Sequence, residues 1–233
     1  MAAAFAAVAS PSAPEVPPPG AMLEPASAVP ATRTDIPVLL VPGWFDTARD
    51  LAALRIRLLA AGWPHVRALT FEDATGSNRD HAAEIETAIA EVLLETGAEE
   101  VDVVAHSMGG LATRWYLMQR TPSPVRRVVF LASPHRGTLS AHLAWGEGRD
   151  EMMPESAFLD SLNAGRFLPP GIEAITIRTP LDTHVLPGES ATLPGVPDHT
   201  VCCPTHQGLL RDDEVFSIVA DFLEGAKAAP VAR

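Results

Sequence analysis

Positive charge is scarce in this sequence. It has 17 arginines and lysines against 29 acidic residues, which gives a net charge of −12, and Lys227 is the only lysine. A chain with so few cations cannot neutralise many phosphates, so nucleic acid is excluded as an expected partner. Because the net charge is negative, binding to anionic membrane surfaces is also disfavoured, whereas neutral esters and lipids remain open as ligands.

Cysteine is nearly absent, and the two cysteines, Cys202 and Cys203, are neighbours. Across a trans peptide their Cα atoms would lie about 3.8 Å apart, which is below the usual range for a disulfide. They also lack the second, separated pair of ligands that a structural zinc site needs. We therefore expect two free thiols in a buried strand, and the cysteines do not report the redox compartment.

The sequence has no apolar run long enough to span a bilayer as a helix. Its first nine residues are small and apolar, and prolines occupy seven positions between residues 10 and 30. The start resembles the end of a signal peptide, with Ala7-Val8-Ala9 as a cleavage site, although no basic segment precedes it. Residues 1–35 are expected to be such a remnant with a linker, which implies a secreted or periplasmic protein. The alternative is a disordered tail, which would also suit the cytoplasm.

The remaining sequence has the periodicity of an α/β protein. With 47% hydrophobic residues in a chain of 233, it can bury the core of one mid-sized domain, expected over 36–225 and followed by a disordered tail at 226–233. Short runs rich in Val and Ile alternate with amphipathic segments of period near 3.6. Expected strands are 36–41, 66–71, 101–105, 127–132, 172–178 and 199–203, and expected helices are 48–60, 78–96, 108–119 and 213–224. This alternation predicts a mostly parallel sheet of about six strands flanked by helices.

The clearest chemical signal is a serine between a predicted strand and a predicted helix. The strand ends at Ala105, and Ser107 follows on a sharp turn that strains its backbone and holds its hydroxyl clear of the sheet. Small residues on either side, Ala105 and Gly109, let the strand and the helix approach each other. We predict that Ser107 is a nucleophile. The alternative is a purely structural role, as the N-cap of a helix after an ordinary turn.

A serine hydroxyl needs a base near neutral pH. Among the eight histidines, His206 follows the last predicted strand, so it lies at the carboxyl edge of the sheet, where the sites of open α/β sheets gather. His106 is interpreted as packing within the turn. Asp182 follows the fifth predicted strand, and we predict that it accepts a hydrogen bond from His206 and stabilises the imidazolium.

Three other aspartates compete with Asp182. Asp212 and Asp213 stand where a helix needs an N-cap, which explains them without catalysis. Asp198 precedes a strand and would lie at the far end of it. Asp182 therefore remains the predicted third member of the catalytic group.

Attack on a carbonyl also requires donors for the negative charge that develops on its oxygen. The N–H of Met108, directly after the serine, is one predicted donor. The second is the N–H of Trp44, in the loop after the first strand, because Gly43 allows a sharp turn there and Pro42 has no N–H.

The segment 137–170 is longer than a simple connection. It is expected to be either a short helical flap over a substrate pocket or a helix packed on the sheet. Side chains expected to border that pocket are Phe45, His135, Trp145 and Met152.

These motifs resemble those of the bacterial lipases and carboxylesterases of the α/β-hydrolase fold, especially the small ones with little or no lid. The resemblance spans residues 37–223 and rests on LLVPGW (39–44), AHSMGG (105–110), SPHRGT (133–138), Asp182 and HQGLL (206–210). The order Ser107, Asp182, His206 is also the one expected of that fold. The resemblance implies hydrolysis of acylglycerols or simpler carboxylic esters through an acyl-serine intermediate, with no cofactor and no metal.

Several questions stay open at this level. The group often has histidine where Pro42 stands, so the shape of the oxyanion loop is not fixed. The same triad would also serve an acyltransferase, a thioesterase or an amidase, and a hydrolase-fold protein without catalysis could bind an apolar ligand. The expected partner is a small ester or lipid, with at most transient contact with lipid aggregates. Acyl chain length and oligomeric state are not determined by these patterns.

Overall fold

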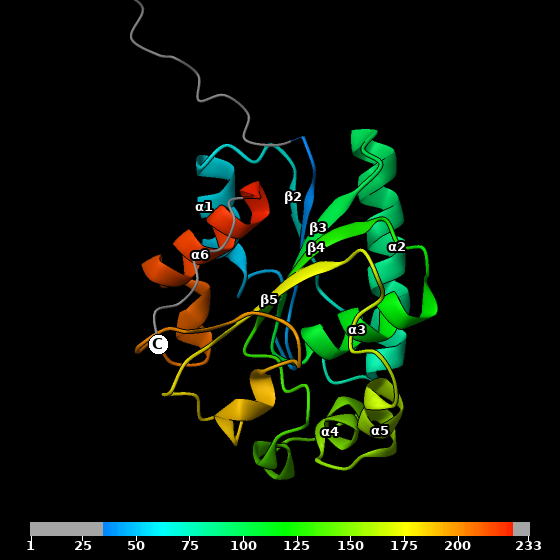
Figure 1. Cartoon of the computed structure of the whole chain (residues 1–233), viewed down its shortest axis with the longest axis vertical. Coiled ribbons are helices and arrows are strands. Elements are labelled where there is room, and N and C mark those ends of the chain that lie inside the picture. The colour runs from blue at the N-terminus through cyan, green and yellow to red at the C-terminus, as the bar shows by residue number, and fades with distance from the viewer. Residues whose placement is uncertain (1–34, 226–233) are drawn as a thin grey trace, which may run out of the picture. The chain divides into compact units, whose positions relative to one another are not determined.

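A parallel sheet forms the centre of the domain (Figure 1). The computed structural model describes residues 35–225, so the predictions for residues 1–34 and 226–233 lie outside the described residues. The six strands are β1 (Val38–Val41), β2 (Val66–Ala68), β3 (Val101–His106), β4 (Val125–Leu131), β5 (Glu173–Arg178) and β6 (Asp198–Thr200). Their order in the sheet is β2-β1-β3-β4-β5-β6, and every neighbouring pair is parallel. This confirms the predicted fold class.

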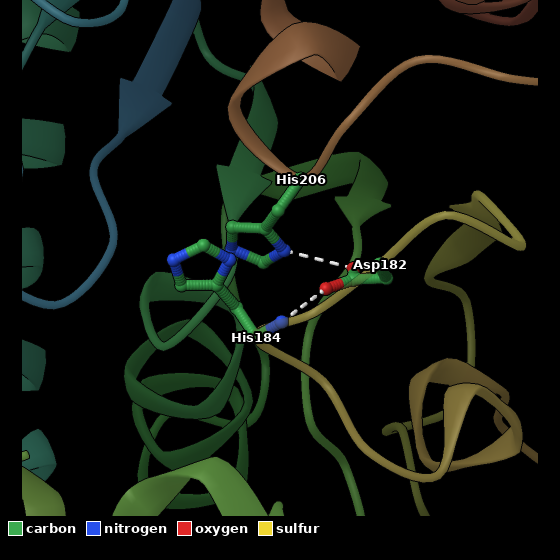
Figure 2. Close-up of side chains that lie close together, drawn as sticks. All are labelled: Asp182, His184 and His206. Carbon is green, nitrogen blue, oxygen red and sulfur yellow. Dashed lines mark hydrogen bonds and ion pairs between the residues drawn. The ribbon is translucent and has the colours of Figure 1, made fainter. Parts of the chain in front are cut away.

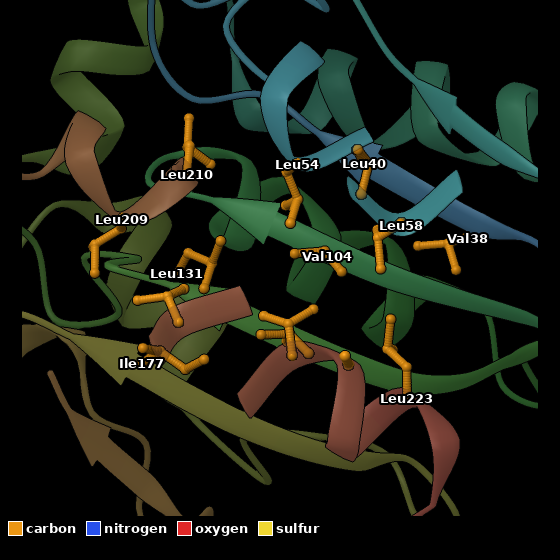
Figure 3. Close-up of a cluster of buried hydrophobic side chains, with 14 of the residues drawn as sticks. Val38, Leu40, Leu54, Leu58, Val104, Leu131, Ile177, Leu209, Leu210 and Leu223 are labelled. Carbon is orange, nitrogen blue, oxygen red and sulfur yellow. The ribbon is translucent and has the colours of Figure 1, made fainter. Parts of the chain in front are cut away.

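Helices cover both faces of the sheet (Figure 1). The helices are α1 (Ala52–Ala60), α2 (Asn78–Thr96), α3 (Gly109–Gln119), α4 (Glu147–Met152), α5 (Ala157–Asn163) and α6 (Asp213–Glu224), with short 3-10 turns η1 (Leu139–Leu143), η2 (Gly188–Ala191) and η3 (Gln207–Leu210). α1 and α6 pack on one face of the sheet (Figure 3), and α2 and α3 pack on the other. Alternate residues of β1 enter the two cores, which explains why all four are apolar.

The bounds of α2 and α6 agree with the sequence pattern because both helices have strong end signals. Ser77 accepts hydrogen bonds from the N–H groups of Arg79 and Asp80, and Gly97 ends α2 with a φ of 70°. The outer strands β2 and β6 are shorter than expected. Each of these strands pairs with a single neighbouring strand over three residues, so no backbone hydrogen bonds to a neighbour support a longer strand.

Cys202 and Cys203 depart from the sequence prediction of free thiols in a buried strand. Strand β6 ends at Thr200, and both cysteine side chains are exposed. Their sulfurs form a disulfide with each other. The prediction assumed a trans peptide, whereas this peptide is cis, with Cα atoms 2.9 Å apart.

In the segment 137–170, helix α5 packs on α3 and not on the sheet, so that expected arrangement is wrong, and a flap over the pocket stays a prediction. The second half of the segment, α5, packs through Phe158, Leu159 and Leu162 into a cluster with Met108 and Leu111 at the start of α3. The first half, around η1, borders a cavity at the carboxyl edge of the sheet. None of the helices between residues 35 and 225 has both the length and the apolar character that crossing a membrane demands.

Candidate active site

Ser107 lies on the turn between β3 and α3 in a strained conformation. Its φ is 52°, in the left-handed region that residues other than glycine seldom adopt. Its N–H donates to the carbonyl oxygen of Leu131 (2.8 Å), and its own carbonyl oxygen accepts from the N–H of Gly110 (3.1 Å). These bonds hold the turn in place, and the strain expected from the sequence is present.

Glycines around this turn allow a close approach of backbone segments. A Cβ atom on Gly109 would overlap the carbonyl oxygen of Pro42 and lie 2.9 Å from Val41 Cγ1. A Cβ atom on Gly43 would lie 2.8 Å from the Cβ of Ser107. The loop after β1 is therefore pressed against both Ser107 and the first turn of α3.

Asp182 and His206 form a buried hydrogen-bonded pair (Figure 2). Nδ1 of His206 is 2.8 Å from Oδ2 of Asp182, and Oδ1 of Asp182 accepts from the N–H groups of His184 and Val185, both at 2.8 Å. Burial raises the pKa of Asp182, but the hydrogen bond from His206, the charge of that ring and the two amides outweigh burial and lower it below 3.8. Asp182 is thus a charged acceptor at neutral pH.

The competing aspartates have other partners. Asp198 bonds to the hydroxyl of Thr176 (2.8 Å) and to Nε of Arg178 (2.9 Å). Asp212 caps α6 by accepting from two amides of its first turn. Asp213 forms an ion pair with Arg57 on the surface. Of the four aspartates weighed from the sequence, Asp182 alone contacts His206.

Ser107 and His206 line the same cavity, which has a volume of about 430 Å³. Two larger grooves, of about 620 and 810 Å³, border the outer strand β2 and strand β5, and neither is lined by Ser107, Asp182 or His206. Burial lowers the pKa of His206 more than the hydrogen bond to Asp182 raises it, so the net shift is below 6.5. His206 is therefore neutral near pH 7 and can accept a proton.

Of the two predicted oxyanion donors, Met108 directly follows Ser107, and Trp44 lines the same cavity as Ser107. Among the hydrogen bonds of residues 35–225, none has the N–H of Trp44 or Met108 as its donor, whereas Phe45 donates to Ala74 (2.8 Å) and Asp46 to Gly43 (3.2 Å). Neither N–H is therefore engaged by a protein acceptor within these residues. Their role as an oxyanion hole stays a prediction.

Three of the four predicted pocket residues border the cavity: Phe45, Trp145 and Met152. The rings of Trp44, Phe45 and Trp145 pack together with centroids 4.7 to 5.7 Å apart. Nε1 of Trp44 also donates to the carbonyl oxygen of Trp145 (3.0 Å). An aromatic wall therefore joins the loop after β1 to the segment after η1.

The prediction for His135 is wrong. Its ring is fully buried against Phe130, with centroids 4.8 Å apart, and Pro134 lines the cavity in its place. The N–H of His135 bonds to the carbonyl oxygen of Ser133 (2.9 Å), and this tight turn sends the ring inward. Burial lowers the pKa of His135 well below 6.5, so this histidine stays neutral.

Sequence reasoning missed several polar residues that line the cavity, among them Asp46, His184 and Gln207. The ring of His184 stacks on that of His206 with centroids 4.7 Å apart and an angle of 24° (Figure 2). Asp46 lies directly after the oxyanion loop, and Gln207 directly after the predicted base. The one sequence signal for these residues was therefore their position next to a predicted motif.

Asp182, His184 and His206 could in principle hold a metal ion, because their ligand atoms lie within 4.8 Å of one another. Asp182 and Nδ1 of His206 already satisfy each other, however. The two rings are also nearly parallel, so their in-plane lone pairs do not converge on one point. The arrangement suits proton transfer better than ion binding.

Known proteins share this architecture. Residues 36–168 match the family model described as alpha/beta hydrolase fold. Aspergillus fumigatus lipase B superposes with a TM-score of 0.69 at 21% identity, over 80% of this chain and 52% of that one. The mature Bacillus licheniformis lipase BlEst2 gives 0.68 at 14% identity, over 81% and 91%. The metagenomic carboxyl esterase MGS0156 gives 0.65 at 15% identity, over 90% and 80%.

The chain spans about half the length of the Aspergillus fumigatus lipase. At these identities the structural likeness shows the fold alone. The family model, in contrast, matches more than half of the sequence and includes β1, β3 and Ser107. The chain therefore belongs to the α/β-hydrolase fold family.

Proposed function

We propose that this protein is a serine hydrolase that cleaves carboxylic esters through an acyl-serine intermediate. The observation that carries the proposal is the buried Asp182–His206 pair, which opens onto the same cavity as the strained Ser107. The order of the three residues along the chain and the lipase and esterase names of proteins with this fold support the same conclusion.

In the proposed mechanism, the hydroxyl oxygen of Ser107 attacks the ester carbonyl carbon while Nε2 of His206 takes its proton. The N–H groups of Trp44 and Met108 receive the oxyanion, and Asp182 stabilises the imidazolium. The carbon–oxygen bond to the alcohol then breaks, and the alcohol leaves with the proton from His206. Water repeats the sequence on the acyl-serine, releases the carboxylic acid and restores the serine.

Apolar side chains around the cavity favour a lipid-like ester, either an acylglycerol or a simpler one. Phe45, Leu143 and Trp145 line the cavity although 61%, 87% and 56% of their surfaces are exposed. Leu139 and Leu186, which are joined by a backbone hydrogen bond, expose further apolar surface on neighbouring segments. The net charge of −12 makes a neutral ester a better substrate than an anionic one.

Replacing the serine tests the proposal directly. Ser107→Ala is expected to reduce kcat on p-nitrophenyl esters by about 10⁴–10⁶-fold, as in a cooperating triad. Ser161→Ala, which removes an exposed hydroxyl on α5, is the matched control and should keep wild-type activity. If Ser107→Ala retains a tenth of the wild-type rate, the proposal is refuted.

Further measurements define the substrate and the acceptor. Rates on esters of two to sixteen carbons, above and below their solubility limits, separate lipase from esterase behaviour. Product analysis with a competing alcohol separates hydrolysis from acyl transfer. Labelling by a fluorophosphonate is expected for wild type and absent for Ser107→Ala, since a binding protein without catalysis has no activated serine.

A further inference from the structure

A second pair of carboxylate and imidazole lies beside the proposed triad. His106 directly precedes Ser107, its ring is fully buried, and its Nδ1 is 3.1 Å from Oδ2 of Asp46. Nε2 of the same ring is 3.4 Å from the carbonyl oxygen of His206, and the two imidazole centroids are 4.7 Å apart. His106 is therefore more than packing within the turn, because it joins the loop after β1 to the segment that carries the base.

Asp46 ties the same two segments together a second time. Its Oδ1 accepts from the side-chain amide of Gln207 (2.8 Å), the residue after His206. Burial raises the pKa of Asp46, but the hydrogen bonds from His106 and Gln207 and the charges of His106 and His206 outweigh burial and lower it below 3.8. The carboxylate is therefore charged at neutral pH, and hydrogen bonds to a charged acceptor are the strong ones.

Asp46 also closes the loop that carries a predicted oxyanion donor. Its N–H donates to the carbonyl oxygen of Gly43 (3.2 Å), which places Trp44 inside a turn that Asp46 ends. A Cβ atom on Gly43 would lie 3.0 Å from Oδ2 of Asp46 and 3.3 Å from Nδ1 of His106. The carboxylate, the imidazole and the turn thus pack directly against one another.

We propose that Asp46 and His106 are positioning residues that fix the Trp44 N–H relative to the imidazole of His206. The inference rests on the proposed function, because it assigns a use to the pair through those two groups. Both the base and the oxyanion donor must lie within hydrogen-bond distance of one substrate. A displacement of about 1 Å between them can cost about 100-fold in rate.

Three substitutions separate the parts of this network. Asp46→Asn keeps the shape and removes the charge, and His106→Ala removes both ring contacts. We expect each to lower kcat by about 10–100-fold while KM stays within about threefold. His106→Asn keeps an N–H near the position of Nδ1, so it should recover part of the loss. Asp198→Asn is the control, because it removes a carboxylate that pairs with Arg178 on β5 instead.

The pH profile distinguishes positioning from a purely structural role. The charged or titratable groups around His206 are Asp182, Asp46, His106 and His184. A negative charge on Asp46 favours the protonated form of His206, whereas a positive charge on His106 disfavours it. Asp46→Asn should therefore move the acid limb of kcat/KM to lower pH, and His106→Asn should move it to higher pH.

The rate of fluorophosphonate labelling of Ser107 separates this inference from the proposed function. A wild-type protein that is neither labelled nor active on esters would defeat the proposed function and this inference with it. If wild type is labelled, but Asp46→Asn and His106→Ala react at its rate with unchanged kcat, the inference alone is overturned. Variants that lose only melting temperature, with kcat and the acid limb unchanged, overturn it as well.

Discussion

Replacing Gly109 by alanine sets helix propensity against packing. Gly109 is the first residue of α3, and alanine in a helix interior is favoured over glycine by about 1 kcal/mol. Helix propensity alone would therefore predict a more stable protein. In the structure, the added Cβ would overlap the carbonyl oxygen of Pro42 and lie 2.9 Å from Val41 Cγ1. Both neighbours are buried, and one of the atoms belongs to the backbone, so neither can move freely.

The expected result is a clear net loss of stability. Overpacking a core costs about 1–3 kcal/mol, and contact with a backbone atom puts this site near the upper end. The gain in helix propensity from alanine is at most about 1 kcal/mol in the first turn of a helix. Subtracting it leaves a net loss of stability of about 2 kcal/mol. For a domain of this size, that loss lowers Tm by about 4–8 °C.

Thermal unfolding followed by circular dichroism measures the effect. Gly165→Ala is the control, because Gly165 is exposed and an added Cβ there would meet no atom within 4 Å. The control should change Tm by no more than about 2 °C. A Gly109→Ala protein that melts at or above the wild-type temperature would refute the packing argument, because it would mean that α3 and the loop after β1 are not in contact.

Three further predictions follow from the charges of the site and of the core. Asp182→Asn should reduce kcat by about 10³–10⁴-fold, far more than Asp198→Asn does, and equal losses would show that Asp182 is not the partner of the base. Because burial lowers the pKa of His206 below 6.5, the midpoint of the acid limb of kcat/KM should lie below pH 6.5. A midpoint above pH 6.5 would contradict this. Burial also holds the pKa of His135 well below 6.5. Below pH 6.5 this histidine is therefore protonated in the unfolded chain but stays neutral in the folded protein. His135 should then contribute a loss of stability of about 1.4 kcal/mol per pH unit, and urea unfolding at pH 7 and pH 5 should show a smaller loss in His135→Gln than in wild type.

The central part of the site could be predicted because each of its residues follows a strand of a parallel sheet. Parallel strands bring their carboxyl ends to one edge, so Ser107 after β3, Asp182 after β5 and His206 after β6 are collected there by topology alone. The turn at Ser107 was visible for a local reason. Its neighbouring strand, helix and glycines all lie within 20 residues, and each constrains the others.

The remainder depended on contacts that no local pattern encodes. Asp46 and Gln207 are 161 residues apart, yet their side chains are hydrogen-bonded. The orientation of His135 depends on a turn of three residues, because the bond from its N–H to Ser133 decides whether it or Pro134 faces the cavity. The pairing of Cys202 with Cys203 likewise depended on a peptide geometry that the sequence does not specify.

The loop from Pro42 to Asp46 is held on three sides, and this bears on how the site would work. Gly109 lets α3 lie against its first residue, Gly43 brings it against Ser107, and the carboxylate of Asp46 bonds to His106 and Gln207. Each of these contacts is made within the protein, so we expect the Trp44 N–H to be positioned before a substrate binds. Donors fixed in advance need no reorganisation when charge develops on the carbonyl oxygen, which is where electrostatic stabilisation is most effective. The apolar rim can then vary with the acyl group while the polar centre stays constant.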